Sequence, residues 1–284
     1  MSALPRPQPI DAGDAGDAHV SRLQATQAAF DSVAADYDGP RGNNALIQRM
    51  RTTMWRVLER RFARDARLLD LGCGTGLDAL HLARTGRQVL ATDWSPLMVE
   101  RTRQRADAAG IAERLEARVL GAHQLEQLQG RFDGAYSDFG PLNCVPDLAA
   151  LAAQCHRLLR PGGQLVFSVI GRYCPWEYLY YRWRRPERAR IRFASGPVAV
   201  GMNRHTIWTS YYRPREFYAA FARCFDLLEY RALSLFLPPP YLAHWYQKHP
   251  RLLEWLGRLD DATGAWPGLR NAGDHFLIVM RRRQ

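Results

Sequence analysis

The sequence predicts an α/β fold in which strands and helices alternate around a mostly parallel sheet. Three observations support this prediction. Residues 67–86 read as a short apolar strand, a glycine-rich turn and a helix. Residues 88–93 read as a second strand that ends in an acid. Further apolar runs, separated by helical patterns, follow up to residue 170. Such alternation is typical of a parallel sheet whose two faces are covered by helices.

The glycine-rich turn has the features of a ligand site. The run Arg67–Leu71 is apolar and ends beside an acid, as expected for a buried strand. Gly72, Gly74 and Gly76 then allow a sharp turn and a close approach of the backbone to a ligand. From Leu77 the apolar spacing becomes helical. A strand, a glycine loop and a helix N-terminus together present backbone N–H groups to a nucleotide-type cofactor.

The glycine spacing differs from that of dinucleotide-binding proteins. Their G-x-G-x-x-G pattern requires a glycine at position 77, which is Leu77 here. Asp70-Leu-Gly72-Cys73-Gly74-Thr-Gly76 instead resembles the first motif of the class I S-adenosylmethionine-dependent methyltransferases. That resemblance implies a Rossmann-like, seven-stranded sheet with an antiparallel last strand, plus N-terminal helices and an inserted cap. It also implies S-adenosylmethionine as cofactor, S-adenosylhomocysteine as product, and no metal.

A second motif follows at the expected distance. Asp93 ends the second strand about 20 residues beyond the glycine loop, where an acid can accept hydrogen bonds from both ribose hydroxyls. The resemblance places Trp94 and Met98 near the adenine. Many family members carry an acid after the third strand, here 117–121, but this chain has none there. The adenine contact is therefore expected from Ala122 or His123, with Gln124 as an alternative.

Two further segments match the family. Residues 29–38 resemble an F-D-x-x-A-x-x-Y-D segment whose tyrosine, Tyr37 here, closes over the cofactor; an ordinary amphipathic helix is the alternative. The fourth strand, residues 132–138, brings Ser137 to the cofactor and is followed by residues that face the transferred methyl group. A helix over 147–159, a turn at 160–163 and a strand over 164–170 match the later landmarks of the family.

The candidates for acceptor binding and proton transfer come from the cap and from the end of the fourth strand. Asp138 and His205 are the candidate proton acceptors, with His244 and His275 as weaker ones, because a lone histidine is more often structural. The residues expected to contact the acceptor are Phe139, Asn143, Tyr173, Trp176 and Tyr211.

The predicted organisation has five parts. Residues 1–20 form a disordered tail, 21–66 N-terminal helices, 67–171 the cofactor-binding core, 172–213 the cap insertion, and 214–284 the C-terminal part of the sheet. The cap interleaves aromatic residues with arginines. This composition suits a flat or anionic acceptor, a membrane surface or single-stranded nucleic acid, but equally a packed cap with a solvated arginine face.

The composition limits the classes of protein to which this chain can belong. Among 284 residues, 47% are hydrophobic, and no apolar run approaches the ~18 residues of a membrane span. The five cysteines show no C-x-x-C pairing, and the N-terminus has no signal-peptide pattern, so we expect a reducing, cytoplasmic location. The charge of +11 comes almost wholly from arginine, with Lys248 the only lysine. It indicates either an anionic partner or a GC-rich genome.

The favoured function is methyl transfer to an O, N or C atom of a small or lipid-like acceptor, such as a secondary metabolite. The alternatives are an RNA or protein methyltransferase and a non-catalytic S-adenosylmethionine-binding regulatory protein. DNA is not an expected partner because the (D/N/S)-P-P-(Y/F/W) motif of nucleic-acid amino methylation is absent after the fourth strand. RNA is less favoured, peripheral membrane contact stays open, and the chain is expected to be a monomer or a homodimer.

Overall fold

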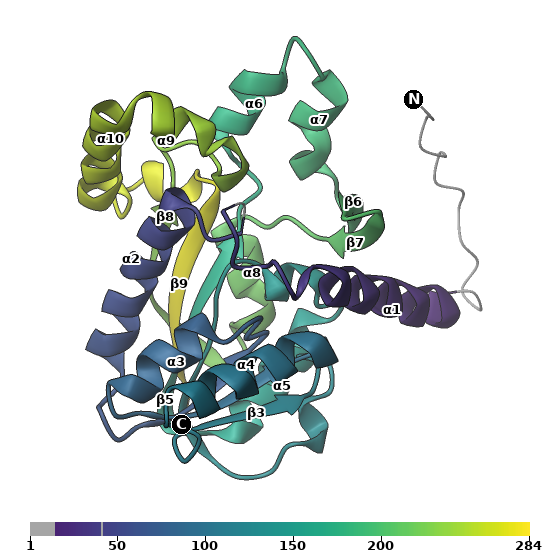
Figure 1. Ribbon diagram of the computed structural model, residues 1–284, viewed down its shortest axis with the longest axis vertical. Coiled ribbons are helices and arrows are strands. Elements are labelled where there is room, and N and C mark those ends of the chain that lie inside the picture. The colour runs from purple at the N-terminus through teal and green to yellow at the C-terminus, as the bar shows by residue number, and fades with distance from the viewer. Residues whose placement is uncertain (1–14, 41) are drawn as a thin grey trace.

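The computed structural model describes residues 15–40 and 42–284. Its main sheet has seven strands in the order β3-β2-β1-β4-β5-β9-β8 (Figure 1). Strand β9 runs antiparallel to both of its neighbours, and every other neighbouring pair is parallel. This confirms the predicted mostly parallel sheet. Its strands are β1 (Arg67–Leu71), β2 (Gln88–Asp93), β3 (Leu115–Val119), β4 (Phe132–Ser137), β5 (Leu159–Ile170), β8 (Phe225–Leu233) and β9 (His275–Arg282).

Helices cover both faces of the sheet. On one face α2 (Ala45–Arg61), α3 (Leu77–Arg84) and α4 (Pro96–Ala108) bury a core that includes Met54, Leu82 and Val99. On the other face α5 (Leu148–Leu158) and α8 (Pro214–Phe221) bury Leu151 and Phe217. Burial of apolar area on both faces is the main stabilising term of such a three-layer fold. It holds the carboxyl ends of the strands in one fixed edge.

The inserted segment between β5 and α8 has its own structure. It contains the helices α6 (Pro175–Tyr181) and α7 (Pro186–Arg190), a 3-10 turn η3 (Ile191–Phe193), and the hairpin β6 (Val198–Met202) and β7 (His205–Thr209). The C-terminal part adds η4 (Pro240–Leu242), α9 (His244–Lys248) and α10 (Pro250–Thr263), which lie beside α6 in Figure 1.

The N-terminal helix α1 (Ala15–Val33) lies beside the β6–β7 hairpin, although the two are far apart in the sequence (Figure 1). The Trp208 amide donates a hydrogen bond to the Thr26 hydroxyl at 3.4 Å. The Arg22 guanidinium stacks over the Trp208 ring, 4.4 Å from its centroid. The hairpin therefore holds α1 across the edge of the sheet where the ligand site lies.

Several predicted boundaries shift. Helix α1 begins at Ala15 rather than near residue 21, and it ends at Val33, so Tyr37 lies beyond the helix. The predicted tail over 1–20 falls mostly outside the described residues. Strand β3 begins and ends two residues earlier than expected. Strand β5 starts at Leu159 and includes the predicted turn, where Gly162 has φ +78° and the pairing with β4 is irregular.

The described residues also bear on disulfides, metal sites and membrane spans. All five cysteines are free thiols. In residues 15–40 and 42–284, no group of three or more His, Cys, Asp or Glu side chains is arranged to hold a metal ion. No helix in the described part of the chain combines the length and the apolar character needed to cross a membrane.

Candidate functional site

The turn after β1 is shaped by glycines that a neighbouring segment approaches closely. Gly72, Gly74 and Gly76 have φ of +81°, +53° and +81°, the left-handed region that glycine adopts without strain. A Cβ on Gly72 would lie 2.3 Å from the Cβ of Pro141, and one on Gly76 would lie 2.6 Å from the Thr102 methyl. Gly74 has more room, since its nearest neighbour would be the Tyr37 ring at 3.7 Å. The turn is therefore packed at its two ends and open toward a ligand at its centre.

Replacing Gly72 with alanine is expected to lower the free energy of unfolding by about 2–3 kcal/mol, because a positive φ and a steric clash add together. Gly110→Ala is the matched control. Gly110 also has a positive φ, +66°, but a Cβ there would meet nothing within 4 Å. We expect it to cost only ~1 kcal/mol. Urea denaturation measures both values, and equal losses would contradict the role given to Pro141.

Asp93 is held in place by the glycine turn. Its Oδ2 accepts from the Gly74 amide at 2.9 Å, and its Oδ1 accepts from the Ser95 amide at 2.8 Å. Burial raises the pKa of Asp93 to about 6, although these backbone bonds oppose the shift. Each carboxylate oxygen has a second lone pair that these bonds leave unused. The fixed carboxylate can therefore accept two further hydrogen bonds from a ligand in the pocket.

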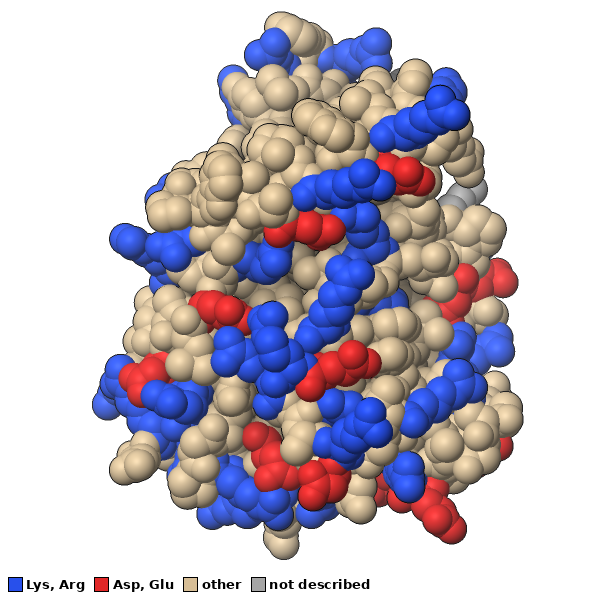
Figure 2. Space-filling view, turned by 90° about the vertical axis from the view of Figure 1, so that its left-hand side faces the viewer, with Lys and Arg blue, Asp and Glu red and all other residues tan. Residues whose placement is uncertain are grey.

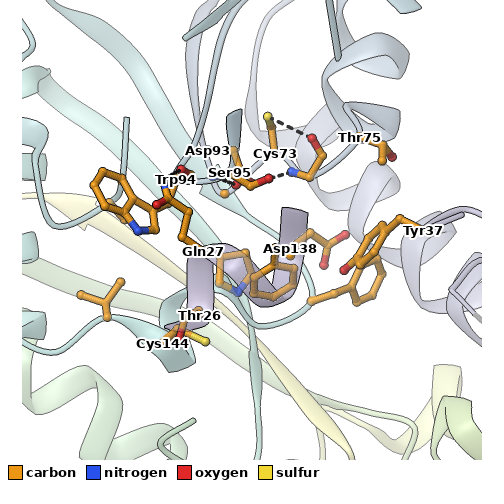
Figure 3. A pocket seen from close by; sticks show the side chains of 18 of the residues that line it. Thr26, Gln27, Tyr37, Cys73, Thr75, Asp93, Trp94, Ser95, Asp138 and Cys144 are labelled. Carbon is orange, nitrogen blue, oxygen red and sulfur yellow. Dashed lines mark hydrogen bonds between the residues drawn. The ribbon is translucent and has the colours of Figure 1, made fainter. Parts of the chain in front are cut away.

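The pocket around this carboxylate lies at the carboxyl ends of β1, β2 and β4 (Figure 3). Trp94 and His123 pack edge to face, 4.8 Å between ring centroids, and together with Ala122 form an aromatic end of the pocket. In the view of Figure 3, Tyr37 lies at the other end of the pocket from Trp94. Burial and the charge of Asp93 raise the pKa of Tyr37 to about 12, so its hydroxyl stays protonated. The predicted residues that line this pocket are Tyr37, Gly72, Cys73, Gly74, Asp93, Trp94, Ala122, His123 and Asp138.

Four residues predicted to contact the cofactor lie behind the pocket wall instead. Asp70 is buried below the turn, and Gly76 caps α3. Met98 is buried in α4, and its amide donates to the Ser95 hydroxyl. The Ser137 hydroxyl donates to the Leu71 carbonyl at 2.6 Å and joins two strands. These side chains support the shape of the site and are not among its lining residues.

Charged residues form the part of the pocket near Tyr37. Arg51 from α2 pairs with Asp78 at 2.5 Å, and the Trp55 indole donates to the same carboxylate at 2.7 Å. Asp138 is 8% exposed, and neither of its carboxylate oxygens has a hydrogen-bond partner among the described residues. Burial and the charge of Asp78 raise the pKa of Asp138 well above its usual range, although the Arg51 charge opposes the rise. A buried acid without a partner is a binding site for a hydrogen-bond donor or a cation.

Beyond this end lies a second cavity of about 700 Å³. Tyr37, Arg51 and Phe139 line both spaces, so the two cavities share one wall. Phe139 has φ +60°, a strained conformation for a bulky residue. Its ring packs edge to face with His275, 5.9 Å between centroids. We refer to this space, which the inserted segment and the η4–α9 region enclose, as the acceptor cavity.

The structure brings two of the five predicted acceptor residues to this cavity. Phe139 and Tyr211 line it. Asn143 does not, because its amide donates to the carbonyls of Ile170 and Ser210 at 3.1 and 2.6 Å and joins two loops. The Trp176 indole donates to the Phe236 carbonyl at 2.6 Å, and Tyr173 stacks under Arg213. These three side chains support the cap from outside the cavity.

The four candidate proton acceptors lie in three different places. His205 lies at the turn of the β6–β7 hairpin, is exposed and lines neither space, although Val200 of the same hairpin lines the acceptor cavity. Asp138 lines the cofactor pocket and not the acceptor cavity. The two weaker candidates, His244 and His275, both line the acceptor cavity.

Sequence reasoning did not identify Arg51, Asp78, Arg192 or Asp274 as site residues. Arg51 lies in a segment that the apolar spacing identified only as a helix. Arg192 was one of many arginines in the cap, and nothing in the sequence distinguished it from its exposed neighbours. Their roles depend on contacts between segments 27 to 82 residues apart.

The comparisons with known proteins agree with this geometry. Residues 68–163 match the family model described as a methyltransferase domain. Over 108 residues the chain is 39% identical to a ubiquinone biosynthesis O-methyltransferase of Xanthomonas axonopodis pv. citri (strain 306). That match covers 38% of this chain and 44% of the relative, so the chain spans less than half of the relative's length.

Two solved structures show how far the fold extends. The Burkholderia thailandensis 1,6-didemethyltoxoflavin-N1-methyltransferase has a TM-score of 0.58 and 19% identity, covering 99% of this chain and 94% of its own. The Streptomyces coelicolor A3(2) geranyl diphosphate C-methyltransferase has a TM-score of 0.53 and 18% identity, with coverages of 83% and 80%. At these identities the likeness shows the fold alone. Residues 68–163 therefore match a methyltransferase domain, and the same fold extends over most of the chain.

Proposed function

We propose that the chain binds S-adenosylmethionine in the pocket around Asp93 and transfers its methyl group to an O, N or C atom of a small acceptor in the acceptor cavity. The observation that carries this proposal is the wall that the two spaces share. Tyr37, Arg51 and Phe139 line both. A donor in one space and an acceptor in the other would therefore meet at these three residues.

The residues of the first pocket fit the parts of the cofactor. Asp93 has lone pairs that the Gly74 and Ser95 amides leave free for the two ribose hydroxyls, and the edge-to-face rings of Trp94 and His123 offer an aromatic corner for the adenine. Asp138, a buried acid without a partner, suits the ammonium of the methionine part, and Arg51 suits its carboxylate. The open centre of the turn at Gly74 lets the backbone approach the ligand.

When bound, the cofactor supplies an electrophilic methyl group on a sulfonium. The protein's part is to align the acceptor atom with that methyl and to keep water out. Helix α1 and Tyr37 cover one side of the first pocket, and the cap encloses the second. We expect alignment by these elements to account for most of the rate enhancement.

A small acceptor is favoured over a macromolecule by the site's shape. A concave, partly open cavity of about 700 Å³ lies within the range of small-molecule sites. On the face shown in Figure 2, basic side chains are interspersed with acidic ones and do not form one continuous basic patch. The matched proteins are named for methylation at oxygen, nitrogen or carbon of small molecules, so their names favour the acceptor class but no single acceptor atom.

Titration calorimetry on the purified chain tests the proposal. We expect one site per chain for S-adenosylmethionine and for S-adenosylhomocysteine, with NAD as a ligand that does not bind. Turnover of the methyl donor with small acceptors would distinguish an enzyme from a regulatory protein. Absence of binding by both sulfur ligands would overturn the proposal. RNA that co-purifies at low salt and is released at high salt would favour an RNA acceptor instead.

The pKa of Asp93 gives a pH dependence of cofactor binding. Above about pH 6 the carboxylate is ionised and can accept from two hydroxyls; below it the protonated acid loses part of this capacity. Affinity for S-adenosylmethionine should therefore fall as the pH is lowered from 7.5 to 5. Calorimetry at four pH values measures this, and Asp93→Asn should bind weakly with a flatter dependence. An affinity of the wild type that is constant over this range would contradict the ribose assignment.

A further inference from the structure

The acceptor cavity contains a histidine and a carboxylate in a defined geometry. His275 is the first residue of β9, is 7% exposed and lines the cavity. Its Nδ1 lies 2.9 Å from Oδ2 of Asp274. Over the described residues, its other ring nitrogen, Nε2, makes no hydrogen bond to the protein. One nitrogen of the ring is thus held by the protein, and the other is left for a ligand.

The identity of the partner determines the tautomer of the ring. An ionised carboxylate only accepts hydrogen bonds, so His275 donates from Nδ1. In the neutral ring, Nε2 then carries the lone pair and is the basic nitrogen. A carboxylate that orients a histidine in this way also stabilises the imidazolium formed when Nε2 takes up a proton.

Asp274 is kept ionised by a buried network. Its Oδ1 accepts from Nη2 of Arg192 at 2.6 Å, and the same nitrogen donates to Oε2 of Glu177 at 2.9 Å. The charge of Arg192 and the hydrogen bond from His275 hold the pKa of Asp274 below its usual range, although burial opposes them. The Tyr241 hydroxyl donates to the same Glu177 oxygen at 2.7 Å. The orienting carboxylate therefore depends on cap residues that fold over the sheet.

The position of the ring relative to the cofactor pocket fits proton removal at the reacting atom. His275 contacts the ring of Phe139, which also lines the cofactor pocket. An acceptor atom that faces the first pocket across Phe139 would lie beside His275. Asp138, the other candidate, lines the cofactor pocket and does not line the acceptor cavity.

We propose that His275, positioned by Asp274, is the general base for the proposed methyl transfer, and that the acceptor presents a weakly acidic O–H or ring N–H on a flat aromatic body. The aromatic and aliphatic lining of the cavity, which includes Phe139, Ile170, Tyr211 and Tyr241, suits such a body. The proposal rests on the proposed function, because it describes the acceptor half of the same site.

Two bonds break and two bonds form in this step. The O–H or N–H proton of the acceptor moves to Nε2 of His275, and the electron pair of that bond stays on the heteroatom. A lone pair of the heteroatom forms the new bond to the methyl carbon. The pair of the broken C–S bond remains on sulfur as a neutral thioether. The imidazolium then pairs with Asp274 until it releases the proton to solvent.

The tautomer can be measured without any acceptor. In the full chain labelled with ¹⁵N-histidine, two-bond ¹H–¹⁵N correlation spectra should show one neutral ring protonated at Nδ1 at pH 8. His275→Gln should remove that signal, and His156→Gln, which alters a histidine of α5 outside both cavities, should leave it. Asp274→Asn should lose the preference for Nδ1–H. A His275 ring protonated at Nε2 in the wild type would overturn the proposal.

Methylation of 4-substituted phenols tests the catalytic role. For the least acidic phenol, 4-methoxyphenol, His275→Ala should lower kcat/KM by ~10²–10⁴-fold. The loss should be smallest for 4-nitrophenol, which is already ionised at pH 8. An equal loss across the series, or a wild type that binds S-adenosylmethionine but methylates no phenol, would overturn the proposal.

His275→Ala should bind S-adenosylmethionine as the wild type does. A wild type that fails to bind the cofactor would instead contradict the proposed function itself.

Discussion

Arg192→Met is expected to lower the free energy of unfolding by about 3–5 kcal/mol, the usual cost of removing one member of a buried ion pair. Arg192 donates to the carboxylates of Glu177 and Asp274 and to the carbonyl of Gly171. Its side chain and both carboxylates are 8% exposed or less. Methionine fills part of the space but leaves two buried carboxylates without their cation. Urea denaturation at pH 8 measures the loss.

A surface pair provides the control for this variant. Arg118 pairs with Glu116 at 2.6 Å, but both side chains are more than half exposed, and such pairs contribute little to stability. Arg118→Met should therefore leave the denaturation midpoint almost unchanged. Similar losses for the two variants would show that the buried network does not have the role assigned to it.

The contribution of Asp274 to the free energy of unfolding should depend on pH with opposite signs in the wild type and in Arg192→Met. In the wild type the pKa of Asp274 is lowered on folding, so its stabilising contribution is present above the unfolded pKa of ~3.9 and is lost as the pH falls through the folded value. Without Arg192, burial alone would raise that pKa. The variant should then be less impaired at pH 5 than at pH 8. A larger deficit at pH 5 would contradict this assignment.

Asp93→Ala is expected to weaken S-adenosylmethionine binding by about 2 kcal/mol, roughly 30-fold, because charge-assisted hydrogen bonds to the ribose are lost. The variant also removes the acceptor of the Gly74 and Ser95 amides, so the turn loses two of its restraints. Calorimetry with S-adenosylmethionine and with S-adenosylhomocysteine should show similar losses, since the two share the same ribose.

An exposed acid on a neighbouring element serves as the control for Asp93. Asp107 lies near the end of α4 and does not line the cofactor pocket. Asp107→Ala should bind both ligands as the wild type does. If Asp93→Ala kept full affinity while remaining folded, the ribose would have to be bound by another group in the pocket.

Much of the donor half of the site could be predicted from the sequence because its signals are local. The turn requires positive φ at three positions, and the sequence shows directly that each of the three is a glycine. Asp93 follows from the length of one strand and the helix cap at Ser95. The strands along the chain follow from apolar runs whose period and separation are those of alternating strands and helices, whereas the antiparallel last strand was implied by the family resemblance.

The acceptor half was decided by tertiary structure. From the sequence His205 was the stronger candidate and His275 a weaker one, yet His275 lines the cavity and His205 lies at an exposed hairpin turn. Asn143 has the chemistry of a binding residue, but the loops that meet around it use both of its N–H donors and one lone pair of its oxygen. Arg192 gains its role from Asp274, 82 residues away. Contacts of this kind depend on which segments pack together over the whole fold, and no spacing along the chain encodes them. The sequence by itself determined the glycine turn, the position of Asp93 and the alternation of strands and helices, because local backbone conformation produces them, whereas only the packed structure decided which side chains line the acceptor cavity.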